Sequence, residues 1–389
     1  MLTSEQLEVR RLALDLVRGE VRPHVEAWDR ERHIPQEIFA ALAELGFLGM
    51  RVPEAHGGLD FDLPTYLAAV EALAWGDAAL GLGLSVHNGP VVRALHAYGS
   101  PEQKERWLTA LAAGEILGAF ALAEGEAGGD LDALATRAVP SEDGDGWILT
   151  GEKAWVTNGD RAGLLVVLAR TGAEGEHLSA FLVPRDAVGI AVEGRERTMG
   201  FSAAEFVTVR FDGVVLPAEA LLGREGDGHD VAADAADVGR LGVAAVALGI
   251  GQAAYEHALR YAAEREQFGR PLHDFGAIQE KLAGMALRIA QSRSLLLQVA
   301  AAAEAGTPVE GLHPASLRAQ VAMAKVSASE AATWIADEAV QIYGGYGYMR
   351  DYPVERLMRD AKGTEIHEGS SELLRMSIAL DAVRDSTPS

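Results

Sequence analysis

The spacing of apolar residues changes twice along the 389-residue chain, and no other sequence feature constrains the fold as strongly. In the first part, apolar residues recur every three or four positions, which predicts amphipathic helices. Ser, Pro and Gly at the segment ends are typical of helix boundaries. The helical segments are 7–28, 35–48, 62–76 and 100–114. We therefore expect an N-terminal helical domain over residues 1–118.

From about Ala119 the pattern becomes one of short apolar runs, which predict strands. The sequences DGDG, TGAEG and DGVVLP lie between these runs and indicate turns. The predicted strands are 146–150, 164–170, 178–184, 189–194 and 205–211. We expect a small antiparallel β domain over residues 119–225.

Helical spacing returns from about Asp230 in long, alanine-rich segments. These segments are 237–265, 277–306, 316–344 and 371–383. A C-terminal helical bundle is expected over residues 226–389. The predicted fold class is therefore α+β, with the β domain between two helical domains.

Composition excludes several classes of function. The chain has no cysteine, which removes disulfides, thiolate metal sites and thiol nucleophiles, and we predict no metal site. A formal net charge of −23 argues against nucleic-acid binding. No apolar stretch is long enough for membrane insertion, and the first 20 residues predict an amphipathic helix rather than a secretory signal, so we expect a cytoplasmic protein.

Two glycine-containing stretches superficially match dinucleotide-binding motifs. GIGQAA begins at Gly249 but lies within a predicted helix, and GGYGY at Gly344 follows a helix and lacks the third glycine. A phosphate-binding turn of this kind must follow a strand. We therefore predict no Rossmann site.

Six motifs gain meaning from their order along the chain. Taken singly, each has a simpler structural explanation, such as an interdomain loop, a hairpin with a core tryptophan, or a helix end. Together they resemble the acyl-CoA dehydrogenase family over essentially the whole chain. The motifs are ALAEGEAGGD, GEKAWVTNG, EREQFGRP, QIYGGYGY, DYPVERLMRDAK and IHEGSSE.

The resemblance implies a homotetramer that uses FAD to desaturate an acyl-CoA thioester between its α and β carbons. The hydride would pass to flavin N5, and an electron-transfer flavoprotein would receive the electrons. The residues matching cofactor-binding positions of the family are Phe120, Leu122, Ala123, Gly128, Gly129, Trp155, Val156, Thr157, Arg265, Gln267, Gly276, Gln341, Gly344, Gly345, Ser370 and Glu372. Those matching substrate-binding positions are Gly129, Asp237, Arg240 and Gly369.

Glu368 is the candidate catalytic base. Removing a weakly acidic α-proton requires a carboxylate in a dry environment, because desolvation raises its pKa. An acidic residue near a helix start can also be purely structural, but Ser370 and Glu372 suit that role better. Some relatives place the base immediately before the arginine that corresponds to Arg240, where this chain has Gly239. We accordingly expect Gly239→Glu to restore some activity to Glu368→Gln.

Five positions depart from the family pattern, and two alternatives remain open. Ala123, Gly125, Gly129 and Gly276 stand where polar or rigid residues are usual, and His367 stands where tyrosine is frequent. A lost neutral hydrogen bond costs only about 0.5–1.5 kcal/mol, so FAD binding should be weaker but retained. The alternatives are a flavin-poor acyl-CoA-binding or scaffold protein, and an oxygen-using flavoenzyme of the same fold.

Overall fold

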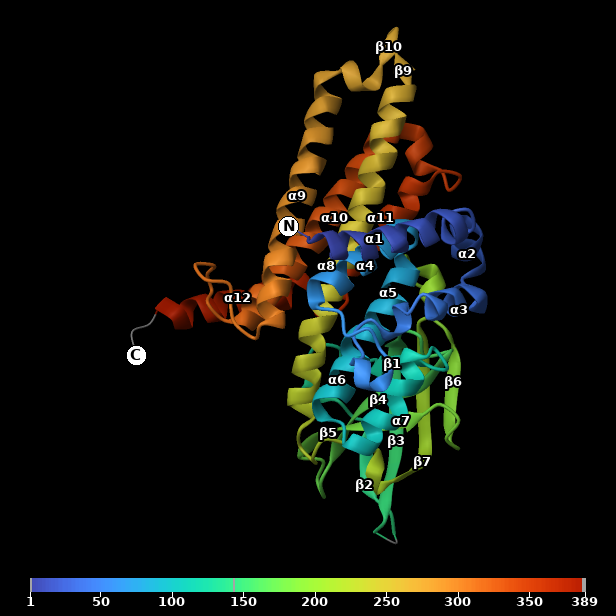
Figure 1. Ribbon diagram of the computed structural model, residues 1–389, viewed down its shortest axis with the longest axis vertical. Coiled ribbons are helices and arrows are strands. Elements are labelled where there is room, and N and C mark those ends of the chain that lie inside the picture. Colours follow the sequence, from blue (N-terminus) through green and yellow to red (C-terminus); the bar gives the residue numbers. More distant parts are fainter. Residues whose placement is uncertain (1, 143, 387–389) are drawn as a thin grey trace.

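The computed structural model describes residues 2–142 and 144–386. Figure 1 shows the sheet at one end of an elongated molecule and the long C-terminal helices at the other, with the N-terminal helices beside them. The predicted order of helices, sheet and helices is confirmed.

The N-terminal part contains two helices that the sequence patterns do not reveal. Residues 78–98 include three glycines and a proline, yet they form α5, a π-helical turn at His87–Val91, and α6. Nearly all of α5 is buried, so its sequence lacks the polar face on which helical periodicity depends. The helices are α1 (Ser4–Leu16), α2 (Val25–Glu31), α3 (Gln36–Glu44), α4 (Leu63–Gly76), α5 (Ala78–Val86), α6 (Val92–Tyr98) and α7 (Pro101–Ala112).

The sheet follows the order β6-β7-β3-β2-β4-β5-β8, with β1 also paired to β4. Its pairings are antiparallel except that β1 and β2 run parallel to β4, which corrects the expected purely antiparallel domain. DGVVLP was expected to form a turn, but it continues β7, where it pairs with β3. The strands are β1 (Leu117–Ala121), β2 (Arg137–Pro140), β3 (Gly146–Val156), β4 (Ala162–Thr171), β5 (His177–Pro184), β6 (Ile190–Arg195), β7 (Val207–Pro217) and β8 (Leu221–Leu222).

The C-terminal part is built around the central helix α8, which packs against both α4 and α10. Gly249 lies inside α8, and a Cβ there would be 2.5 Å from the backbone oxygen of Glu71 on α4. This glycine therefore allows close packing of two helices. The GIGQAA motif lies inside a helix, as predicted. The elements are α8 (Gly228–Glu264), β9 (Glu266–Gln267), β10 (Arg270–Pro271), α9 (Gly276–Glu304), α10 (Leu317–Tyr343), α11 (Pro353–Ile366) and α12 (Ser371–Ser386).

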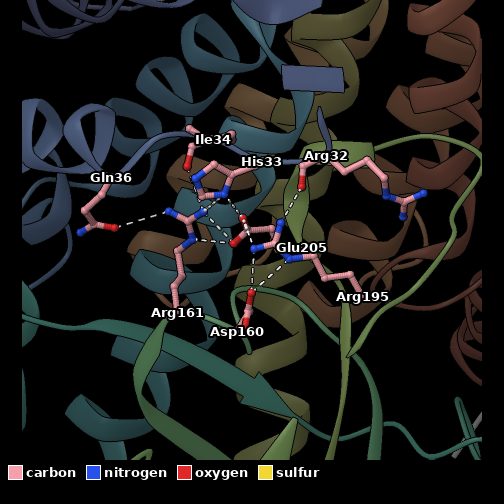
Figure 2. Close-up of polar contacts among 8 residues, drawn as sticks. All are labelled: Arg32, His33, Ile34, Gln36, Asp160, Arg161, Arg195 and Glu205. Atoms are coloured by element: carbon pink, nitrogen blue, oxygen red, sulfur yellow. Dashed lines mark hydrogen bonds and ion pairs between the residues drawn. The ribbon is translucent and has the colours of Figure 1, made fainter. Parts of the chain in front are cut away.

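A buried carboxylate joins the N-terminal helices to the sheet (Figure 2). Glu205 is 3% exposed, and its oxygens lie 2.6 Å from Arg161 Nη2 and 3.1 Å from Arg195 Nη2. His33 Nδ1 contacts the same carboxylate at 2.5 Å. Because these residues come from the α2–α3 connection, the β3–β4 turn, β6 and the segment before β7, the cluster fixes the relative position of the two domains.

Glu205→Gln should lower the free energy of unfolding by about 3 kcal/mol, because it leaves the largely buried Arg161 without its counter-charge, whereas the partly exposed Arg195 keeps Asp160 at 2.8 Å. Glu193→Gln is the matched control, since Glu193 forms an exposed pair with Arg210 and exposed pairs contribute about 0–1 kcal/mol. Denaturant unfolding of both variants measures the difference. Equal losses in the two variants would contradict a special role for the Glu205 cluster.

None of the helices in the described residues is long and apolar enough to span a membrane.

Candidate active site

Glu368 lies in a strained turn between two helices. Helix α11 ends at Ile366, His367 is extended, and α12 begins at Ser371. Glu368 has φ +56° and Gly369 has φ +98°. A left-handed conformation is unfavourable for a residue with a Cβ and is often retained where function requires it.

The carboxylate of Glu368 faces α8. A Cβ built on Gly239 would lie 2.6 Å from Glu368 Cδ, so the glycine leaves the space that this side chain occupies. Other residues stabilise the start of α12. Ser370 Oγ accepts a hydrogen bond from the N–H of Leu373, and Glu372 is the acidic residue of the first turn. Glu368 is therefore free of the helix-start role.

Burial raises the pKa of Glu368 to about 7, although the nearby cations Arg240 and Lys325 act in the opposite direction. Within residues 2–142 and 144–386, no donor forms a hydrogen bond to its carboxylate oxygens. A carboxylate of this kind can exchange a proton near neutral pH, as a general base must.

The raised pKa also predicts how stability depends on pH. The folded state binds the Glu368 proton more tightly than the unfolded state, so ionisation destabilises the fold progressively as pH rises from about 4.5 to 7. Glu368→Gln removes this cost, which should be on the order of 2 kcal/mol at pH 8. The variant should therefore gain melting temperature over wild type at pH 8 but much less at pH 5. The same difference at both pH values would contradict the raised pKa.

Trp155 departs from its expected place in the sheet. The pairing of β3 with β7 shifts register between Lys153 and Val156, and Trp155 within this bulge has φ +53° and is 49% exposed. Val156 and Thr157 are buried. The simpler explanation of GEKAWVTNG as a hairpin with a core tryptophan is therefore wrong, because Trp155 is not a core residue. The bulge turns the indole outward, where a ligand can contact it.

The loop that follows β1 is held by a buried ion pair that the sequence analysis missed. Lys153 Nζ donates to the backbone oxygen of Leu122 at 2.8 Å and to Glu124 Oε1 at 2.7 Å. Glu124 also accepts hydrogen bonds from the N–H groups of Ala135 and Thr136. The sequence signal for this ion pair was one charged residue from each of the motifs ALAEGEAGGD and GEKAWVTNG. The pair holds the loop on the side opposite its exposed glycines.

The front of this loop is open except at one point. A Cβ on Gly125 or Gly128 would meet nothing within 4 Å, whereas one on Gly129 would lie 2.6 Å from Leu373 Cδ1. The contact brings the loop against the start of α12, next to Glu368. It also explains one departure from the family pattern, because a serine at position 129 would require Leu373 to move. Phe120 and Leu122 are half-buried at the base of the loop, and Ala123 lies beside them in sequence.

The expected substrate residues on α8 lie beside the base. Arg240 Nη1 contacts Asp237 Oδ1 at 2.9 Å, and Arg240 Nε donates to the backbone oxygen of Glu368 at 3.2 Å. Arg318 on α10 contacts the other oxygen of Asp237 at 3.0 Å. Asp237, Arg240 and Gly369 therefore gather around Glu368.

A second group of expected cofactor residues lies at the other end of the molecule. Arg265 and Gln267 belong to the β9–β10 hairpin, and the Arg265 guanidinium lies 5.7 Å from the ring centroid of Tyr346. Gly344 and Gly345 begin the turn that contains Tyr346, and Gln341 precedes it at the end of α10. Gly276, at the start of α9, faces open space. The hairpin forms the tip opposite the sheet in Figure 1, so one chain does not bring this group to Trp155.

Comparisons with known proteins identify the family. The family models for the acyl-CoA dehydrogenase N-terminal, middle and C-terminal domains match residues 3–115, 119–214 and 226–382, respectively. An acyl-CoA dehydrogenase of Bacillus subtilis (strain 168) is 39% identical over 382 residues, covering 97% of this chain and 98% of the relative.

Two solved structures are similar over nearly their whole length. Butyryl-CoA dehydrogenase from Megasphaera elsdenii has a TM-score of 0.93 and 36% identity, covering 99% of both chains. A glutaryl-CoA dehydrogenase from Mycobacterium smegmatis in complex with FADH2 has a TM-score of 0.89 and 30% identity, covering 97% of this chain and 94% of that one. With all three domains matched in order, this chain belongs to the acyl-CoA dehydrogenase family.

Proposed function

We propose that the protein is an FAD-dependent acyl-CoA dehydrogenase in which Glu368 removes the α-proton of the thioester. The observation that carries this proposal is the geometry of Glu368, a carboxylate in a left-handed turn, facing Gly239 and without a hydrogen-bond donor in the described residues. A structural carboxylate would use its oxygens as acceptors. This one keeps them available for a proton from a ligand.

The residues near Glu368 fit a flavin. Gly125 and Gly128 leave their side of the loop open for close approach, and the bulge in β3 exposes the flat indole of Trp155. FAD, when bound, supplies the acceptor for the β-hydride. Phe120, Leu122, Ala123, Gly128, Gly129 and Trp155 to Thr157, together with Ser370 and Glu372, would hold it. The missing polar groups predict weaker binding than in relatives.

The protein supplies the acid–base part of the reaction. Burial raises the pKa of Glu368 to about 7, so its ionised form is more basic than an exposed glutamate. Negative charge develops on the thioester oxygen as the proton leaves, and a fixed donor would stabilise it. The backbone N–H of Glu368 has no acceptor among the described residues and is available for this role. Asp237, Arg240 and Gly369 would orient the substrate.

Anaerobic mixing of the FAD-loaded protein with acyl-CoA thioesters of increasing chain length tests the activity. At least one thioester should bleach the flavin absorbance, and an electron-transfer flavoprotein should then reoxidise it faster than oxygen does. Faster reoxidation by oxygen would instead indicate an oxidase. A protein that stays colourless with excess FAD would favour the binding or scaffold alternative.

We also propose a homotetramer, as the family resemblance implies, and an apolar helix face that the chain leaves uncovered supports association with another copy. Leu373, Met376 and Leu380 are 48%, 61% and 58% exposed and lie on one face of α12, which projects from the body in Figure 1. Apolar residues at this spacing are typical of a helix that packs against a partner. A neighbouring copy could bring its β9–β10 hairpin to the flavin, joining the two groups of cofactor residues.

Arg265→Ala should weaken FAD retention, because the guanidinium would contact the pyrophosphate through charge-assisted hydrogen bonds worth about 1.5–3 kcal/mol. The expected loss of affinity is about tenfold or more, measured by flavin fluorescence during dilution. Arg11→Ala, which removes an exposed arginine on α1, is the control. Unchanged FAD affinity, or a monomer that holds FAD tightly, would contradict the proposed assembly.

A further inference from the structure

Lys325 is a fully buried lysine that holds the turn carrying the base. It lies on α10, and its ammonium donates to the backbone oxygens of Glu365 at 3.0 Å and Gly369 at 2.7 Å. Glu365 is in the last turn of α11, where carbonyls lack helical partners, and Gly369 directly follows the base. One ammonium therefore clamps both ends of the turn around Glu368.

Stability alone does not account for a buried ammonium at Lys325. Removing an ammonium from water costs several kcal/mol, and an apolar side chain would fill the same space at lower cost. Lys325 forms no ion pair with a carboxylate in the part of the chain that the structure describes. Its two partners are neutral carbonyls, and burial lowers its pKa to about 8, so the ammonium is still largely protonated at pH 7 and acts on the turn between them.

Few of the titratable groups around the Glu368 carboxylate are positively charged. Tyr66 on α4 is neutral, because burial raises its pKa to about 12. His367 is also neutral near pH 7, because burial lowers its pKa. Arg240 on α8 and Lys325 on α10 are the cations that lower the pKa of Glu368 against the effect of burial.

These two cations are not equivalent. Arg240 lowers the pKa of Glu368 more than Lys325 does, but it also contacts the Asp237 carboxylate at 2.9 Å and would contact substrate. Lys325 is enclosed behind the turn. A cation placed there can favour the ionised form of the base without occupying space that the thioester needs.

We infer that Lys325 is a positioning residue for the reaction: its buried ammonium fixes the 365–369 turn and favours the ionised form of the Glu368 carboxylate. The inference rests on the proposed function, in which Glu368 is the base. The effect is electrostatic as well as mechanical, so it predicts a change in pH dependence that loss of a structural contact alone would not produce.

Lys325→Met removes the charge and nearly preserves the volume. In the FAD-loaded protein, the apparent pKa for flavin reduction by the best thioester should rise by about one pH unit. With a wild-type value near 7, the variant should be about fivefold slower at pH 7, and the two rates should converge above pH 9. Rapid mixing without oxygen between pH 6 and 9.5 measures the profile.

Lys362→Met is the matched control, because it removes the same charge from an exposed lysine on α11 that pairs with Glu365 at 2.7 Å. Its pH profile should match that of wild type. A Lys325→Met enzyme slowed equally at every pH would reduce the role of Lys325 to structural support and overturn the inference. If that variant does not fold, Lys325→Gln is subject to the same test, and an unchanged pKa in it would also overturn the inference.

Failure of this inference is separable from failure of the proposed function. If Glu368→Gln still reduces flavin rapidly, the assignment of the base is wrong whatever Lys325 does. If Glu368→Gln is slow while Lys325→Met keeps the wild-type pKa, Glu368 remains the base and only the role of Lys325 is rejected.

Discussion

Glu368→Gln should reduce the rate of flavin reduction by about 10²–10⁴-fold, the range typical of lost general-base catalysis. The amide keeps the size of the side chain but cannot accept the α-proton. No carboxylate stands at position 239 to replace it. Single-turnover reduction by the best thioester, without oxygen, is the appropriate measurement, because it isolates proton and hydride transfer from later electron transfer.

The comparison is informative only if the site remains intact. FAD content should equal that of wild type, and the melting temperature should be unchanged or higher, since the amide also removes the cost of a buried charge. Rapid bleaching by Glu368→Gln would exclude Glu368 as the base.

Moving the base to α8 should recover the most activity when position 368 is also emptied. A Cβ at position 239 would lie 2.6 Å from Glu368 Cδ, so Gly239→Glu requires the side chain at position 368 to move aside. Glu368→Gln keeps a full-length side chain there, so we expect only partial rescue by Gly239→Glu in that background. Glu368→Gly creates the space and also suits the left-handed φ of +56°.

The double variant Glu368→Gly/Gly239→Glu should reduce flavin at least about tenfold faster than Glu368→Gly alone, because it restores a carboxylate to the same cavity. Gly239→Glu in the wild-type background should be inactive and destabilised by the steric overlap and by two like charges. Glu368→Gly/Gly239→Gln is the control without a base. Equal rates in the two double variants would show that the second position does not reach the substrate.

The sequence predicted the features that depend on local pattern. Long helices with one apolar face and strands of alternating burial were recognisable, as were the motifs that gather around Glu368. Helix α5 was missed because a fully buried segment has no polar face to reveal its period, and the short α6 follows it through a π-helical turn that contains Gly89 and Pro90. DGVVLP was misread because an Asp-Gly pair usually favours a turn, whereas here the pairing with β3 continues through it.

Other features depend on contacts between distant segments, which a single sequence does not record. The bulge that turns Trp155 outward arises from the register of β3 against β7. Lys325 appears in the sequence as one polar residue of an amphipathic helix, and only the fold brings it to the carbonyls of Glu365 and Gly369. Likewise, only the fold shows that the absence of a side chain at Gly239 leaves space for Glu368.

The Lys153–Glu124 pair behind the glycine-rich loop has a consequence for how this protein can diverge. The backbone course of the loop is specified by contacts on its rear side, with Leu122, Ala135 and Thr136. Side chains on the front face are therefore not needed to maintain that course. Mutational drift can replace them one at a time while the backbone shape is inherited, which accounts for Ala123 and Gly125 in an otherwise preserved architecture. New ligand preferences can evolve on this face without a new fold.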